Sequence, residues 1–134
     1  MSLKDIRLAD RSLAQQRNVV SELNGIVRDI ERCERTISEL QSELIDINTR
    51  FNGPRDTRQD IEYLSGLLAC AKRKLAWEKT IASLQKRTPE VLQELTHLLN
   101  DPKNPPADEM RALMLRALQG VQDAMERLQS VKPM

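Results

Sequence analysis

Few side chains in this sequence have the type and spacing that catalysis or metal binding requires. His97 is the only histidine, and its neighbours Thr96 and Leu98 offer neither a nucleophile nor a metal ligand. We therefore expect a surface imidazole rather than a catalytic one. Cys33 and Cys70 lack the spacing of a zinc site and fall on apolar stripes, which predicts buried thiols. No enzymatic activity, metal or cofactor is expected.

A run of basic side chains is a second candidate site. It comprises Lys72, Arg73, Lys74 and Lys79. Such a patch can bind nucleic acid or anionic lipid, but no aromatic side chains alternate with it to stack on bases. The net charge of +1 also gives the chain no general attraction to nucleic acid. We interpret the run mainly as a solvated face that pairs with acids on a neighbouring helix, and keep a binding patch as the alternative.

Acidic side chains gather on both sides of the segment Asn52–Pro54. They are Glu39, Glu43, Asp46, Asp56, Asp60 and Glu62. One interpretation is a well-solvated end of the structure. The other is an exposed surface that receives a partner of complementary charge. Both interpretations fit the pattern, so these six residues are candidate partner-binding residues.

The segment Asn52–Pro54 interrupts a chain whose apolar residues otherwise follow helical spacing. Gly53 is predicted to take the positive φ that ends a helix, and Pro54 cannot continue one. Thr57, with Asp60 three residues later, is predicted to cap the next helix. Upstream, the spacing of three and four residues forms a heptad seam: Leu23, Ile26, Ile30, Cys33, Ile37, Leu40, Leu44, Ile47 and Phe51.

These signals predict a single all-α domain over residues 1–134. The expected elements are a helix over about 2–51, a turn over 52–57, a helix over 57–99 with a break or kink at Thr88–Pro89, a loop over 100–106 and a helix over 107–131. The short turn makes the first two helices an antiparallel hairpin. Aromatic residues are only 2% and charged residues 31% of the chain, a mixture typical of long helices and coiled coils.

The last helix is expected to fold back along the second and to form a three-helix bundle at the base of the hairpin. Residues 34–74 would then project as a two-stranded coiled coil. Trp77 is predicted to close the top of the bundle, and an interface anchor is the alternative interpretation. In either case its indole N–H needs a hydrogen-bond partner.

Antiparallel pairing also predicts which residues face one another across the hairpin. The favoured register sets Leu40 against Leu68 and Cys33 against Leu75, and it brings the like charges of Asp46 and Glu62 together near the tip. The same register sets acids against lysines, at Glu22 with Lys86, Asp29 with Lys79 and Glu34 with Lys74. The seam of the second helix would then consist of Ile61, Leu64, Leu68, Ala71 and Leu75.

The features together predict a non-enzymatic protein–protein interaction module, a scaffold or adaptor that presents a projecting antiparallel coiled coil. Its partner is expected to be another protein with helices of its own. The alternative is a module that binds a membrane or cytoskeletal surface through the basic second helix. Salt-sensitive binding to anionic liposomes or to filaments would separate the two. Nucleic acid and membrane are not the partners we expect.

The last helix carries more apolar residues than one neighbouring groove needs, and Met114 and Leu115 are the candidate interface residues. A homodimer is therefore expected, with the last helix or the bare coiled coil at its interface, because two-fold pairing is the commonest way to cover such a strip. A cytoplasmic location is expected, since the charged N-terminus lacks the apolar segment of a signal peptide and the two cysteines do not form a disulfide scaffold. The ends of the chain also suit a piece of a longer protein.

Overall fold

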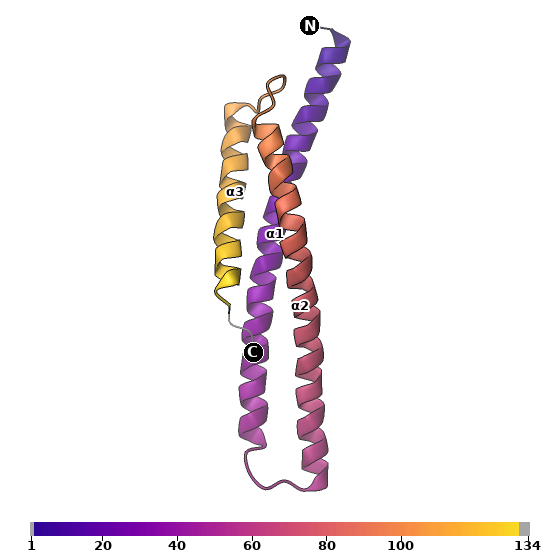
Figure 1. The fold of residues 1–134 in the computed structure, drawn as a ribbon, viewed down its shortest axis with the longest axis vertical. Helices are drawn as coiled ribbons and strands as arrows, with labels where there is room; N and C mark the ends of the chain where they lie inside the picture. Colours follow the sequence, from indigo (N-terminus) through magenta and orange to yellow (C-terminus); the bar gives the residue numbers. More distant parts are fainter. Residues whose placement is uncertain (1, 132–134) are drawn as a thin grey trace.

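The computed structural model describes residues 2–131, which form three α-helices and no strand. They are α1 (Leu3–Arg50), α2 (Thr57–Leu99) and α3 (Asp108–Gln129). Figure 1 shows α1 and α2 as a long antiparallel hairpin, with α3 against the half that is remote from the hairpin turn. The all-α class, the hairpin and the three-helix base are therefore confirmed.

The first helix begins with a capping box and extends past the other two. The Ser2 hydroxyl oxygen accepts a hydrogen bond from the Asp5 backbone N–H at 3.1 Å, and the Asp5 carboxylate accepts one from the Ser2 backbone N–H at 3.2 Å. Hydrogen bonding to Ser2 lowers the pKa of Asp5 below its ordinary value. Residues 3–11 are exposed, and in Figure 1 this end of α1 projects beyond α2 and α3.

The hairpin turn differs from the prediction in two respects. Gly53 does not have positive φ, so left-handed glycine geometry is not what ends α1. The N-cap of α2 is Asp56 rather than Thr57, and its carboxylate accepts from the Gln59 backbone N–H at 2.8 Å. Arg55 fastens the turn, because its guanidinium donates to the Phe51 carbonyl oxygen at 2.7 Å and lies 4.4 Å from the centre of the Tyr63 ring.

Helix α2 continues through Pro89 without a break. The proline removes one backbone N–H from the helical hydrogen-bond pattern. Thr88 does not cap a new helix: its hydroxyl donates to the Leu84 carbonyl oxygen at 2.6 Å, one turn back along the same helix. Residue 89 is exposed, so its ring faces solvent rather than the bundle.

Helix α3 packs mainly on α1, and touches α2 only sparingly, which corrects the prediction that it follows α2. Small side chains on α3 permit the close approach. A Cβ at Gly120 would lie 3.6 Å from Val27 Cγ2 on α1, and Ala117 and Ala124 are buried nearby in the same core. The buried core of this base comprises Val19, Leu23, Ile26, Ile30, Cys33, Leu84, Val91, Leu95, Leu98, Met114, Ala117, Val121, Ala124 and Leu128.

The register across the hairpin is not the predicted one. Leu40 is completely buried, but Leu68, its expected partner, is 57% exposed. The face of α2 that meets α1 includes Gly66, where a Cβ would lie 3.1 Å from Ile47 Cδ1. On the same face the Trp77 indole N–H donates to the Cys33 carbonyl oxygen at 2.9 Å. The α2 residues that are buried or half-buried along this seam are Tyr63, Gly66, Leu67, Cys70, Lys74, Trp77, Ile81 and Leu84.

The predicted charge pairs fail for the same reason. Asp29 lies 3.8 Å from Arg87 rather than beside Lys79. Glu34 lies 3.4 Å from Arg127 of α3, so it is not paired with α2. Among residues 2–131, α3 ends close to the level of this ion pair, and the rest of the hairpin toward its turn consists of α1 and α2 (Figure 1).

Candidate protein-interaction surface

The outward side of α2 carries a row of large aliphatic side chains that no other part of the described chain covers. Ile61 is 60% exposed, Leu64 61%, Leu68 57% and Leu75 53%. Their spacing of three, four and seven residues places them on one side of the helix, and Ala71 fills the remaining heptad position. We call these five residues the outer stripe. They are the residues that the sequence-based register assigned to the hairpin seam.

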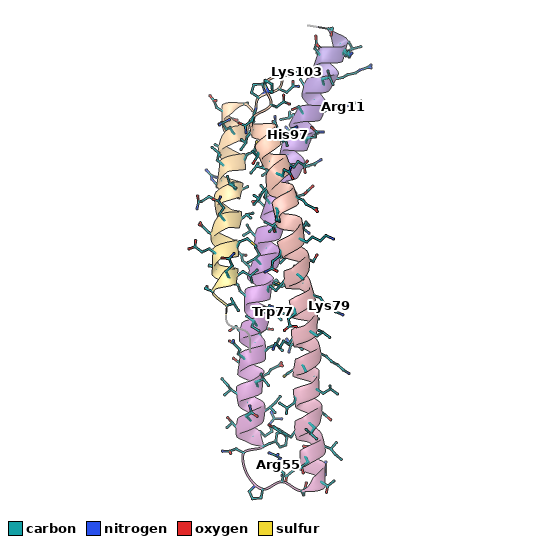
Figure 2. The ribbon with its side chains drawn as sticks, viewed as in Figure 1. Arg11, Arg55, Trp77, Lys79, His97 and Lys103 are labelled. Carbon is teal, nitrogen blue, oxygen red and sulfur yellow. The ribbon has the colours of Figure 1, made fainter. Side chains whose placement is uncertain are left out.

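One edge of the outer stripe is basic. Lys72 follows Leu68 by four residues and Lys79 follows Leu75 by four, so each lysine is the helical neighbour of a stripe leucine. Both lysines are exposed, and neither forms an ion pair within residues 2–131. Figure 2 shows Lys79 on the side of α2 that is turned away from α1.

The other two members of the predicted basic patch serve the hairpin itself. Arg73 bridges to α1, with one guanidinium nitrogen 2.7 Å from a Glu43 carboxylate oxygen and another 3.6 Å from Glu39. Lys74 is half-buried and lies 3.9 Å from Glu78. The four basic residues therefore do not form one patch. Arg73 and Lys74 pair with carboxylates, whereas Lys72 and Lys79 border the outer stripe.

Most of the acidic residues near the tip are also engaged within the protein. Asp56 caps α2, and Asp60 lies 2.8 Å from Arg55. Glu62 lies 3.4 Å from Arg58, one turn away on the same helix. Glu39 and Glu43 bind Arg73, as described above. Of the six candidate acids, Asp46 and Asp56 are exposed without an ion pair among the described residues, and Asp56 is used in the cap of α2. Four of the six carboxylates therefore lie beside an arginine of the protein itself.

The two candidates on α3 have different surroundings. Met114 is completely buried in the three-helix core and cannot contact a partner. Leu115 is 44% exposed, and Leu113 beside it is 46% exposed. Leu113 and Leu115 are the large apolar residues exposed on α3, but they lie about 200° apart around the helix and do not form one row like the outer stripe.

Of the residues with reactive side chains, the two cysteines are buried and the histidine is exposed. Burial raises the pKa of the Cys33 thiol, and the charge of Asp29 adds to that shift. Burial also raises the pKa of Cys70, and so does its hydrogen bond to the Glu43 carboxylate, with 3.6 Å between Sγ and Oε2. His97 is exposed near the end of α2 (Figure 2). Trp77 has the hydrogen-bond partner that its indole was expected to need.

Residues 2–131 hold no group of three or more histidine, cysteine or acidic side chains arranged to bind a metal ion. Within the same residues, none of the three helices has a stretch that is both long and apolar enough to cross a bilayer. Comparisons of the chain with protein-family models, with curated proteins and with solved structures give no match.

Sequence reasoning found the residues of the outer stripe but placed them in the core. The signal for a surface was present, because α2 carries two apolar stripes and one neighbouring helix can cover only one of them. The stripe that contains Leu67, Cys70 and Trp77 is the one that meets α1. The stripe that α1 does not cover is the candidate site. Comparing the number of apolar faces on α2 with the number of helices available to cover them would have identified it.

Proposed function

We propose that this protein is a non-catalytic interaction module, a scaffold or adaptor whose projecting hairpin is recognised by another protein through the outer stripe. The observation that supports it is the exposure of Ile61, Leu64, Leu68 and Leu75, each more than half accessible in a regular heptad row. A row of this kind on a folded helix is a usual docking surface for a second helix.

The position of the stripe suits this role. Among residues 2–131, this part of the hairpin consists of α1 and α2, so a partner can approach α2 without meeting α3. The hairpin is held together behind it by Trp77, by Cys70 and by the ion pairs of Arg73. A partner would therefore meet a surface that is already formed, which reduces the entropy lost on binding.

Photo-cross-linking in the cell of origin tests the proposal. A photoreactive benzophenone amino acid is placed at Leu68, and the matched control places it at Ala69, which is also exposed but lies about 100° further round the helix. A discrete adduct with another protein from position 68, and not from 69, is the expected result. Equal labelling from both positions, or no adduct from either, contradicts docking at the stripe.

Binding to an anionic membrane or a filament is the second candidate, favoured by the two unpaired lysines beside the stripe. The stripe is narrow, however, because Asp60, Glu78 and Lys74 lie along its other edge. A helix that lies in a membrane interface usually has a broader apolar face and a polar face rich in lysine and arginine rather than acids. Co-sedimentation with anionic liposomes at low and high salt distinguishes this candidate from a protein partner.

A further inference from the structure

The outer stripe also indicates what kind of helix it receives. We infer that its partner is an amphipathic helix whose apolar seam is bordered by aspartate or glutamate, docked along α2 over residues 61–79. This inference rests on the proposed function and adds the chemistry of the partner. It is carried by the charges that border the stripe, which are unequal on its two edges.

The basic edge of the stripe carries positive charge that is not paired within residues 2–131. Lys72 and Lys79 have no ion-pair partner among residues 2–131, and Lys86 continues the same edge one heptad further, also exposed and without one. On the other edge the carboxylates are occupied, since Asp60 lies 2.8 Å from Arg55 and Glu78 lies 3.9 Å from Lys74. A docked helix therefore meets uncompensated positive charge on one side and neutralised charge on the other, which favours carboxylates on the partner.

A second copy of this chain is a poor match through the same surface. Antiparallel pairing of two outer stripes, with Leu64 against Leu75 of the other copy, sets Lys79 beside Arg58 of that copy. Parallel pairing in register sets Lys74 beside Lys79 of the other copy at the flanking heptad positions. Like charges meet in both arrangements, and such contacts select against the pairing.

The size of the stripe also fits a single helix. Four side chains of this exposure form an apolar patch of a few hundred Å², whereas a stable protein–protein interface usually covers about 800 Å² on each partner. One helix laid along the stripe contacts no more than the few hundred Å² that the stripe offers. We expect a weak contact, because little area is available beyond the stripe and its lysines.

Binding of designed peptides to the intact protein tests the inference. The probe is a helix of about three heptads with leucine at the seam positions and glutamate at the flanking positions. Two control peptides carry glutamine or lysine in place of the glutamates. Affinities are measured at low salt by fluorescence anisotropy, for the wild-type chain, for Leu68→Gln and for the double variant Lys72→Glu/Lys79→Glu. All these substitutions are at exposed positions, and circular dichroism verifies that each variant is folded.

We expect the wild-type chain to bind the glutamate peptide about tenfold more tightly than the glutamine peptide and to bind the lysine peptide least. The double variant should reverse that order, and Leu68→Gln should lose all three peptides. Equal affinity for the three peptides, or no binding of the glutamate peptide, overturns the acidic partner, and the photo-cross-link at position 68 separately decides whether the stripe docks a protein. Binding of anionic vesicles that the double variant abolishes would also overturn it, in favour of a lipid surface.

Discussion

Leu40 and Leu68 are the same residue type on the two helices of the hairpin, but their burial is opposite. Leu40 on α1 is completely buried, whereas Leu68 on α2 is 57% exposed. We expect Leu40→Ala to lower the free energy of unfolding by about 2–5 kcal/mol, because it removes buried methyl groups and leaves a cavity. Leu68→Ala should change it by no more than about 0.5 kcal/mol. Urea unfolding of both variants measures the contrast, and equal losses would contradict the observed register.

The alkylation rates of the two thiols should depend on pH differently in the folded and the unfolded protein. Burial raises the pKa of both Cys33 and Cys70, and a raised pKa lowers the fraction of reactive thiolate at any given pH. In the folded protein, alkylation by iodoacetamide should therefore need a higher pH than in the urea-unfolded chain. Mass spectrometry of the alkylated protein over a pH series provides the rates. Folded and unfolded rates that rise over the same pH range would show that the thiols are not shielded as described.

At the scale of the element, the hairpin turn is determined by its cap and not by its glycine. Gly53 lacks positive φ, and a Cβ added there would have no atom within 4 Å. Gly53→Ala should therefore leave stability unchanged or raise it by about 0.4–1 kcal/mol, by restricting the unfolded chain. Asp56→Ala should cost about 1 kcal/mol, because it removes the side-chain cap of α2. Thermal unfolding compares the two variants, and a large loss for Gly53→Ala would contradict this account of the turn.

The helices were predictable from the sequence, but the face that α2 turns to α1 was not. The Asn-Gly-Pro interruption and the heptad spacing of α1 were sufficient for a hairpin, since both are local signals. Both stripes of α2, however, have apolar residues at heptad spacing, and periodicity does not distinguish between them. The choice depends on particular contacts, such as the close approach at Gly66 and the hydrogen bond of Trp77, which a pattern of residue types does not contain.

The outer stripe was assigned to the hairpin seam because the sequence pattern does not show which face of α2 meets α1. Lys72 and Lys79 were recognised as basic, but their place beside Leu68 and Leu75 follows only when that stripe is known to face solvent. Most of the carboxylates near the tip are paired with Arg55, Arg58 and Arg73, and their role as partner-binding residues stays a prediction. Of these pairs, only those of Arg73 cross the hairpin and depend on its register, whereas the pairs of Arg55 and Arg58 are local to the turn and to α2.

At the scale of the whole molecule, the homodimer expected from the sequence stays a prediction, with a narrower candidate interface. With Met114 buried, the exposed apolar residues of α3 are Leu113 and Leu115. We expect light scattering to show a weak dimer at high protein concentration, and Leu115→Glu to return it to the monomer without unfolding. Leu68→Gln is the matched control and should leave the dimer intact. A monomeric mass at all concentrations would contradict the prediction.

The proposed docking surface requires that the outer stripe face solvent in the isolated protein and be available to a partner. The rate at which a cysteine at position 68 reacts with a maleimide tests it directly, because the native thiols are buried and should react slowly. We predict that Leu68→Cys in a monomeric sample reacts nearly as fast as a small free thiol, and that Leu40→Cys is protected. Protection of the cysteine at position 68 to the same degree as that at position 40 would contradict both the register and the proposed docking surface.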